Sequence, residues 1–176
     1  MTEPGELDQA TWDALQRIIP IACVDLLPVR LDERGRVSSI GLILRKVPLR
    51  DPAWCLVGGR VRYSETLAEA RMRQTQITLG SGVACSTLLG GQPATVAEYA
   101  PGGSPRFRWD PRKHAIAITY LVELEGVPVP QGEALDFRWF PPGSGLTRSQ
   151  VGFDQDQVID ACLAHLEGGP DQGWWG

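Results

Sequence analysis

Residues 54–80 read WCLVGGRVRYSETLAEARMRQTQITLG, and this order predicts a strand, a glycine turn and a helix. Trp54–Val57 is a short apolar run, as expected of a buried strand. Gly58-Gly59 would let the backbone turn tightly or approach a ligand closely. Ser64 is a suitable N-cap for the helix, and Gly80 is a suitable residue to end it. The stretch therefore predicts a strand that bends at two glycines and leads into a helix.

The predicted helix has two faces. One is mostly apolar and comprises Ala68, Met72, Thr75 and Leu79; the other is polar and comprises Glu65, Glu69, Arg73 and Gln76. Arg73 is placed to pair with an acid earlier on the polar face. On spacing alone, the interpretation is an amphipathic helix with a solvated face of ion pairs.

The same residues resemble the signature of the Nudix hydrolase superfamily. Gly59 is followed after five residues by Glu65, seven more residues lead to Arg73, and Gly80 stands where that signature ends. The lead-in from Trp54 and the surrounding pattern are most similar to the GDP-mannose mannosyl hydrolase branch. The resemblance implies a Nudix-like α/β/α sandwich and hydrolysis of a nucleoside diphosphate linked to another group, with Mg²⁺ or Mn²⁺ as cofactor.

Three positions depart from this signature. Family members carry metal-binding carboxylates where this chain has Gln74, Ile77 and Thr78. Magnesium prefers hard, usually anionic oxygen ligands, and none of these three side chains supplies one. The chain is therefore identified as a Nudix-type protein with a degenerate box, in which metal binding is expected to be weak or absent.

The remaining segments predict one domain over residues 1–176. Helices are expected within 1–19 and 151–167, strands over 21–27, 37–45, 83–89 and 114–124, and a mobile loop within part of 92–110. Residues 136–139 resemble a further strand of the Nudix branch named above. Residues 168–176 form a tail in which Trp174-Trp175 would pack on the domain or on a partner subunit. This order indicates an α/β/α sandwich with a mixed central sheet.

Composition narrows the class of protein. The hydrophobic fraction is 43%, the charged fraction is 22% and the formal net charge is −4, which argues against general nucleic-acid binding. No apolar run is long enough to span a membrane. Four widely spaced cysteines favour reduced thiols in a cytoplasmic protein over disulfides or a zinc site.

Arginines and one aspartate are the first candidates for binding and catalysis. Asp25 interrupts an apolar strand, and the matching aspartate of the resembled branch lies in its active site; a hydrogen-bonded strand end is the alternative. The resemblance also places Arg45 against a nucleotide sugar, although it could be a solvated strand end. Arg45, Arg60, Arg62 and Arg73 are expected to converge near Gly58-Gly59, where guanidinium groups would suit a diphosphate.

Three further side chains and one backbone carbonyl are weaker candidates. His114 could act as an acid or base, Trp109 could stack on a base, and each could instead be structural. By resemblance, the Gly58 carbonyl would contact a metal. Glu133 stands where the resembled branch has a metal-binding glutamine, so it is a tentative metal ligand and catalytic residue, or else a solvated loop acid.

Three functions remain open at this point. The first is a Mg²⁺-dependent hydrolase, most simply of nucleotide sugars, with weak or altered activity. The second is a Nudix-fold protein that binds a nucleotide-type small molecule without turnover. The third is a structural or interaction protein, expected as a homodimer without a small ligand.

Overall fold

The computed structural model describes residues 7–102, 108–166, 169 and 172–176. The strands are β1 (Ile21–Leu31), β2 (Val37–Arg45), β3 (Ala53–Cys55), β4 (Val57–Arg60), β5 (Ala84–Thr87), β6 (Thr95–Ala100), β7 (Arg108–Trp109), β8 (Ala115–Glu125) and β9 (Ala134–Phe140). The helices are α1 (Gln9–Leu15), α2 (Leu67–Leu79), a 3₁₀ turn η1 (Arg148–Gln150) and α3 (Gln155–Leu163).

The strands form one mixed sheet with the path β3-β2-β1-β8-β6-β7. β4 also pairs with β1, β5 with β8, and β9 with β2. The central strand β1 is parallel to β8 and antiparallel to β4 along its first half, and it pairs with β2 from Val29 onward. Pro28, which has no N–H to donate, lies where β1 changes partners. This change of partners curls the sheet.

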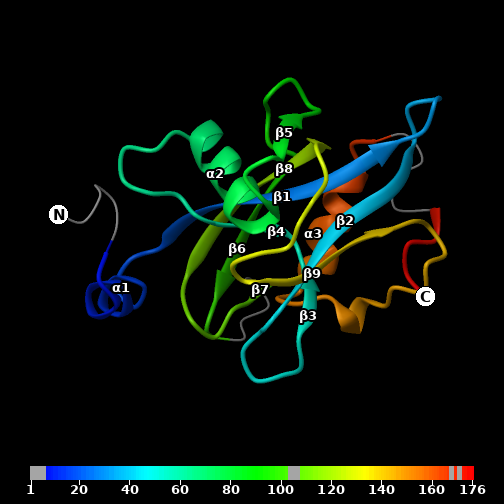
Figure 1. Cartoon of the computed structure of the whole chain (residues 1–176). Helices are drawn as coiled ribbons and strands as arrows, with labels where there is room; N and C mark the ends of the chain where they lie inside the picture. The colour runs from blue at the N-terminus through cyan, green and yellow to red at the C-terminus, as the bar shows by residue number, and fades with distance from the viewer. Residues whose placement is uncertain (1–6, 103–107, 167–168, 170–171) are drawn as a thin grey trace.

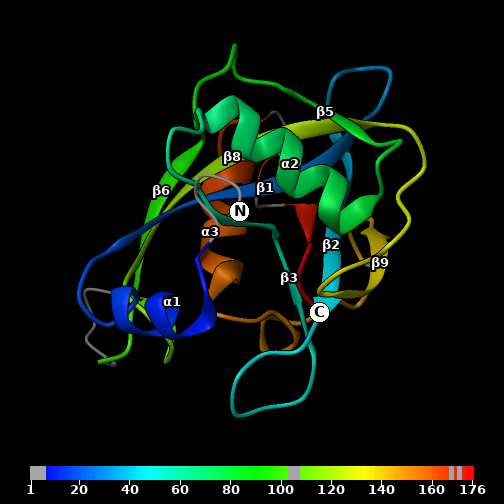
Figure 2. The ribbon, with the colours of Figure 1, turned by 60° about the vertical axis from the view of Figure 1, so that its left-hand side comes forward.

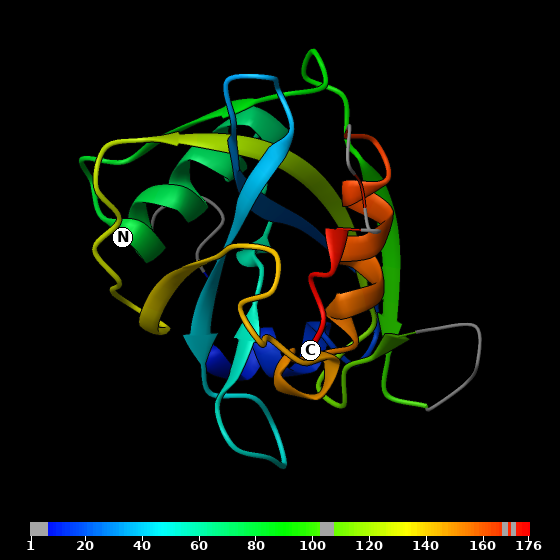
Figure 3. The same ribbon diagram turned by 90° about the vertical axis from the view of Figure 1, so that its right-hand side faces the viewer.

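The two longer helices cover opposite faces of the sheet. α2 packs against β4, β5 and β1, whereas α3 packs against β6 and β8 (Figures 2 and 3). The core between them consists of fully buried aliphatic side chains such as Leu26, Ile43 and Leu121. The prediction of an α/β/α sandwich with a mixed sheet is therefore confirmed.

The predicted bend at Gly58-Gly59 is wrong, because both glycines lie inside β4. Neither has a positive φ, so space and not conformational freedom requires glycine here. A Cβ at Gly58 would lie 2.4 Å from Asp25 Oδ1, and one at Gly59 would lie 2.5 Å from Gln74 Nε2. The two glycines let a carboxylate and a helix side chain approach the β4 backbone.

The predicted helix start is also corrected. Thr66, not Ser64, is the N-cap of α2, and it forms a capping box with Glu69. Ser64 has φ of 60° and belongs to the preceding loop, as does Glu65. Glu69 consequently accepts hydrogen bonds from the Thr66 backbone and hydroxyl, which leaves Glu65 as the partner of Arg73.

The buried face of α2 differs from the predicted apolar stripe. The buried side chains are Ala70, Gln74, Thr75, Thr78 and Leu79. Two of the positions where the resembled signature has an acid, Gln74 and Thr78, therefore face the protein interior. The third, Ile77, is 49% exposed.

Several predicted boundaries shift at the ends of the chain and in the loops. The expected loop 92–110 contains β6 and β7, and its residues 103–107 lie outside the described part. The N-terminal helix is limited to α1, and the C-terminal helix to α3 after a 3₁₀ turn. In the tail, Trp174 is 1% exposed and Trp175 donates its indole N–H to Asp160, so the tail packs on its own domain.

The four cysteines are free thiols, as expected. Burial raises the pKa of Cys23 to about 11 and the pKa of Cys55 and Cys162 to about 12. These thiols stay protonated and unreactive at neutral pH. No helix in the described part of the chain is long and apolar enough to cross a membrane.

Candidate functional site

Asp25 is placed by the central strand beneath the two glycines. In the sheet register it lies opposite Gly58 of β4 and Thr119 of β8, and it is only 8% exposed. Burial raises the pKa of Asp25 from 3.8 to about 6, while the charges of Lys113 and Arg45 limit the rise. A carboxylate with this pKa can accept a proton near neutral pH.

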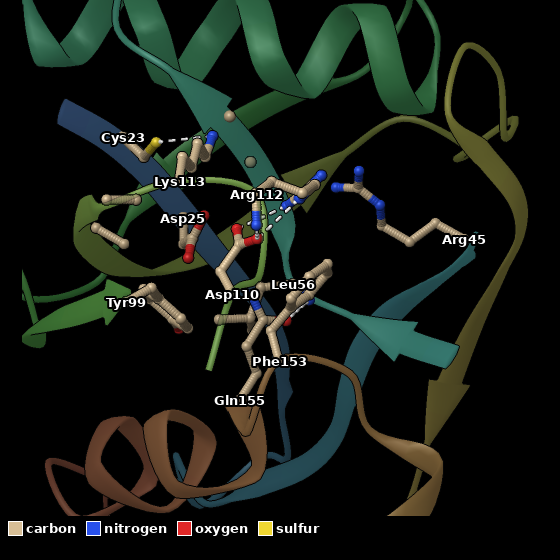
Figure 4. Close-up of a pocket in the computed structure, with 14 residues that line it drawn as sticks. Cys23, Asp25, Arg45, Leu56, Tyr99, Asp110, Arg112, Lys113, Phe153 and Gln155 are labelled. Carbon is tan, nitrogen blue, oxygen red and sulfur yellow. Dashed lines mark hydrogen bonds and ion pairs between the residues drawn. The ribbon is translucent and has the colours of Figure 1, made fainter. Parts of the chain in front are cut away.

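Asp25 faces a pocket in which a second buried acid is neutralised by an arginine. Asp110, 4% exposed, accepts hydrogen bonds from Arg112 Nε at 2.9 Å and from a terminal guanidinium nitrogen at 2.8 Å. The guanidinium of Arg112 lies 4.7 Å from the ring centre of Phe153. These contacts fix the orientation of Arg112 at the mouth of the pocket (Figure 4).

A second arginine enters from the opposite side. Arg45, at the end of β2, pairs with Glu133 at 2.6 Å and lies 5.9 Å from the Phe153 ring. Figure 4 shows the side chains of Arg45 and Arg112 reaching toward one another. Two facing guanidinium groups form a fork that matches the oxygens of a phosphate.

Two hollows meet at this fork. The deeper one, with a cavity volume of about 60 Å³, is lined by Cys23, Asp25, Leu56, Tyr99, Asp110, Ala115, Ala117, Phe153 and Gln155 together with the residues shared between the two. The outer one has a volume of about 280 Å³ and adds Leu7, Gln9, Trp12, Arg60 and Glu133. The shared residues are Arg45, Gly58, Gly59, Arg112 and Lys113. Only the outer hollow has room for a group the size of a nucleotide.

The outer hollow is cationic although the whole chain has a net charge of −4. It contains four cations and one carboxylate, that of Glu133. Arg60 and Lys113 form no ion pair with any carboxylate in the described ranges. Instead, both contact the indole of Trp12, at 4.7 Å and 5.6 Å from its ring centre. Lys113 also donates to Cys23 Sγ at 3.8 Å. Without an ion pair, these two cations keep charge that an anionic ligand can neutralise.

The helix α2 does not offer a metal site of the kind that the resemblance implies. Gln74 is 6% exposed and donates its amide N–H to the carbonyl of Arg60, Thr78 is 2% exposed, and Ile77 has no donor atom. Glu133, the tentative metal ligand, is ion-paired with Arg45. Among the described residues no three His, Cys, Asp or Glu side chains cluster as metal ligands. The donor set therefore does not fit Mg²⁺ or Mn²⁺ at the box.

The expected convergence of four arginines is only half correct. Arg45 and Arg60 line the outer hollow, whereas Arg62 and Arg73 line a separate hollow beside the start of α2. Arg73 binds Glu65 through two hydrogen bonds of 2.6 and 2.7 Å and also donates to the Arg60 carbonyl. The acid that pairs with Arg73 is thus Glu65, not Glu69 one turn back, and the contacts of Arg73 connect α2 to β4.

Two other candidates lie away from both hollows. His114 precedes β8 and lines a shallow depression with Ile18 and Pro111. Trp109 lies in β7, where its backbone N–H donates to Asp154. Neither residue is among those lining the two cationic hollows.

Sequence reasoning missed Trp12, Asp110, Arg112 and Lys113. The last three come from the segment Asp110-Pro111-Arg112-Lys113. Its charges precede a strand predicted from alternation, which is the one signal that could have identified it. Trp12 carries no such signal, because its role depends on where α1 lies.

Comparisons with known proteins relate this chain to one protein family and to solved structures. Residues 2–167 match the family described as "Domain of unknown function (DUF4916)". A solved structure from Jonesia denitrificans DSM 20603, described as "posible asymmetric diadenosine tetraphosphate (Ap(4)A) hydrolases", is 36% identical, with a TM-score of 0.75, over 84% of this chain and 95% of that one. No curated protein matches the sequence.

Two more distant structures show the same fold. The Nudix domain of Shewanella oneidensis NrtR, complexed with ADP ribose, is 16% identical with a TM-score of 0.59, over 90% of this chain and 99% of that one. A bifunctional NMN adenylyltransferase/ADP ribose pyrophosphatase from Francisella tularensis, complexed with AMP and a Mn ion, is 19% identical with a TM-score of 0.59. The match covers 89% of this chain and 45% of that one. The chain therefore belongs to the DUF4916 family, and its fold is that of the Nudix hydrolases.

Proposed function

We propose that this protein binds a nucleotide-type phosphate ester in the outer hollow and that its own cations, not a metal on α2, neutralise the phosphates. The observation that carries the proposal is the pair Arg60 and Lys113, which lie beside Gly58-Gly59 without a carboxylate partner in the described part of the chain. Solved relatives described as binding ADP ribose or AMP support a ligand of this class.

The physical argument concerns charge. A diphosphate carries two or more negative charges, and most Nudix-type sites offset them with metal held by carboxylates, as the resemblance implies. Here the acids are replaced on α2, while Arg45 and Arg112 face each other above the pocket. Guanidinium groups bind phosphate oxygens in pairs, and such charge-assisted hydrogen bonds are about twice as strong as neutral ones.

The test is calorimetric titration of ADP into the protein with either EDTA or Mg²⁺ present. We expect the Kd to be nearly the same in both, and Lys113→Met or Arg60→Met to raise it about tenfold or more, the loss of one charge-assisted contact. Arg34→Gln removes the same charge from an exposed turn and is the matched control. Binding that requires Mg²⁺, or variants that bind like wild type, would contradict the proposal.

A second candidate is hydrolysis of such a ligand, and Asp25 favours it. With a pKa of about 6, the Asp25 carboxylate is ionised at neutral pH and can take a proton from an attacking water in the deeper hollow. Arg45 and Arg112 would then stabilise the departing phosphate. The resemblance suggests a nucleotide sugar as substrate, and the Jonesia denitrificans relative suggests a dinucleoside polyphosphate.

Chromatographic detection of nucleotide products from a panel of both substrate classes, with EDTA, Mg²⁺ or Mn²⁺, tests this candidate. We expect Asp25→Asn to abolish any product formation that wild type shows; an unchanged rate would remove Asp25 from the mechanism. We do not propose Mg²⁺ dependence, because the donor set on α2 does not fit the ion. A homodimeric state remains a proposal, and the mass of the protein in solution tests it. A cytoplasmic location is proposed because free, buried thiols suit a reducing compartment.

A further inference from the structure

The short helix α1 lies apart from the two helices that cover the sheet (Figure 1). It is seven residues long, Asp8 caps it, and none of its residues is buried. A helix this short is marginal in water and is normally held in place by an apolar face. Within α1, Trp12 is the one hydrophobic side chain that packs against the core, so the helix contributes little to the core.

Trp12 is the residue that connects α1 to the rest of the domain. It is partly buried at the edge of the core, and its ring lies near Arg60 from β4 and Lys113 from the segment before β8. Each of these cation–ring contacts contributes about 0.5–1 kcal/mol at an exposed site. The contacts also hold the indole in the wall of the outer hollow, next to Gly58-Gly59.

We infer that Trp12 is the platform on which the aromatic base of the ligand stacks. This rests on the proposed binding of a phosphate ester, and it names the ligand as one with an aromatic ring beside its phosphates. α1 and the residue before its cap contribute one indole, one amide and one aliphatic side chain to the hollow, those of Trp12, Gln9 and Leu7, and two of the cations lie against the indole. A nucleoside diphosphate has the same division into an aromatic part and an anionic part.

The arrangement couples the two parts of the ligand. Arg60 and Lys113 both hold the indole and face the space for the phosphates, so a ligand anchored by its phosphates has its base next to the ring. Stacking on an aromatic side chain tolerates any base. The hollow is therefore selective for nucleotides over sugar phosphates or inorganic phosphates, without a fixed choice of base.

Calorimetry with two probes, ADP and pyrophosphate, tests the inference on the full-length protein. Trp12→Ala should raise the Kd for ADP about tenfold or more, as expected for loss of one stacked base, and change the Kd for pyrophosphate by less than about twofold. Trp12→Phe should recover most of the affinity for ADP. Trp139→Ala is the matched control, because Trp139 also lies against an arginine, Arg30, but lines a different hollow.

The outcomes separate the two proposals. Equal losses for ADP and pyrophosphate in Trp12→Ala would show that Trp12 only positions the cations, and this would overturn the inference while leaving the binding function standing. An unchanged Kd for ADP in that variant would overturn it too. Wild-type protein that binds neither probe would overturn the proposed function and the inference together.

Discussion

Asp25→Asn is expected to stabilise the protein at neutral pH. The ionised Asp25 carboxylate is buried at 8% exposure, and burial raises its pKa from 3.8 to about 6 even with Lys113 and Arg45 nearby. Between pH 3.8 and about 6, Asp25 therefore keeps its proton in the folded state, whereas it has lost that proton in the unfolded chain. Stability is lost as the pH rises from 3.8 to about 6, and the loss is complete above that range.

The size of the effect follows from that difference. The two pKa values are about two pH units apart, and each unit corresponds to about 1.4 kcal/mol, so the ionised group costs the fold about 3 kcal/mol at pH 7. At pH 4 the folded state is almost fully protonated and the unfolded chain is about 40% protonated, so the cost falls below about 1 kcal/mol. Asparagine has the same shape without the charge, so it removes the cost and keeps the packing against Gly58.

Urea unfolding of wild type and Asp25→Asn at pH 4.0 and pH 7.5 measures this difference. The gain in the free energy of unfolding should be several times larger at pH 7.5 than at pH 4.0. Asp51→Asn, at an exposed position, is the control for a change in overall charge. An equal gain at both pH values, or a variant less stable than wild type at pH 7.5, would refute the reasoning.

Three further predictions concern the frame of the site, each checked by chemical or thermal unfolding. Arg73→Ala should cost about 1–3 kcal/mol, since its partly buried glutamate partner loses two charge-assisted hydrogen bonds; unchanged melting would contradict this. Thr66→Ala should lower the free energy of unfolding by about 1 kcal/mol and Ser64→Ala should hardly change it, because only the threonine is the N-cap. A larger loss in Ser64→Ala than in Thr66→Ala would show that Ser64 is the N-cap. Gly59→Ala should lower the free energy of unfolding by about 1–3 kcal/mol, because the added methyl group crowds Gln74. Adding Gln74→Ala should recover part of this loss. If the effects of the two substitutions simply add, the contact is not responsible.

Strands with a clear apolar run were predictable from sequence. The predicted strand 37–45 coincides with β2, and the predicted 114–124 agrees with β8 to within one residue, because a run rich in β-branched and aliphatic residues marks a strand regardless of its neighbours. β6 was missed because its six residues are flanked by glycines and prolines that indicate a loop. Its pairing with β8 is a tertiary contact that no local pattern reports.

The candidate site was less predictable because it depends on distant contacts. Glycine serves equally for a bend and for close approach, and sequence cannot tell these uses apart; only the position of Asp25 beneath Gly58 decides between them. Arg60 and Lys113 are 53 positions apart in the chain, and they meet through Trp12 on a helix whose own pattern predicts nothing about where it lies.

The replacement of the acids on α2 is part of the packing and not an isolated loss. The amide of Gln74 donates to the carbonyl of Arg60, and Arg73 donates to the same oxygen. A carboxylate at position 74 would face that carbonyl without a proton to give, while being 94% buried against Gly59. The glutamine thus fixes the end of β4, and with it Arg60, at the edge of the outer hollow. The glutamine that stands where the resembled signature has an acid therefore supports the cation that we propose binds phosphate.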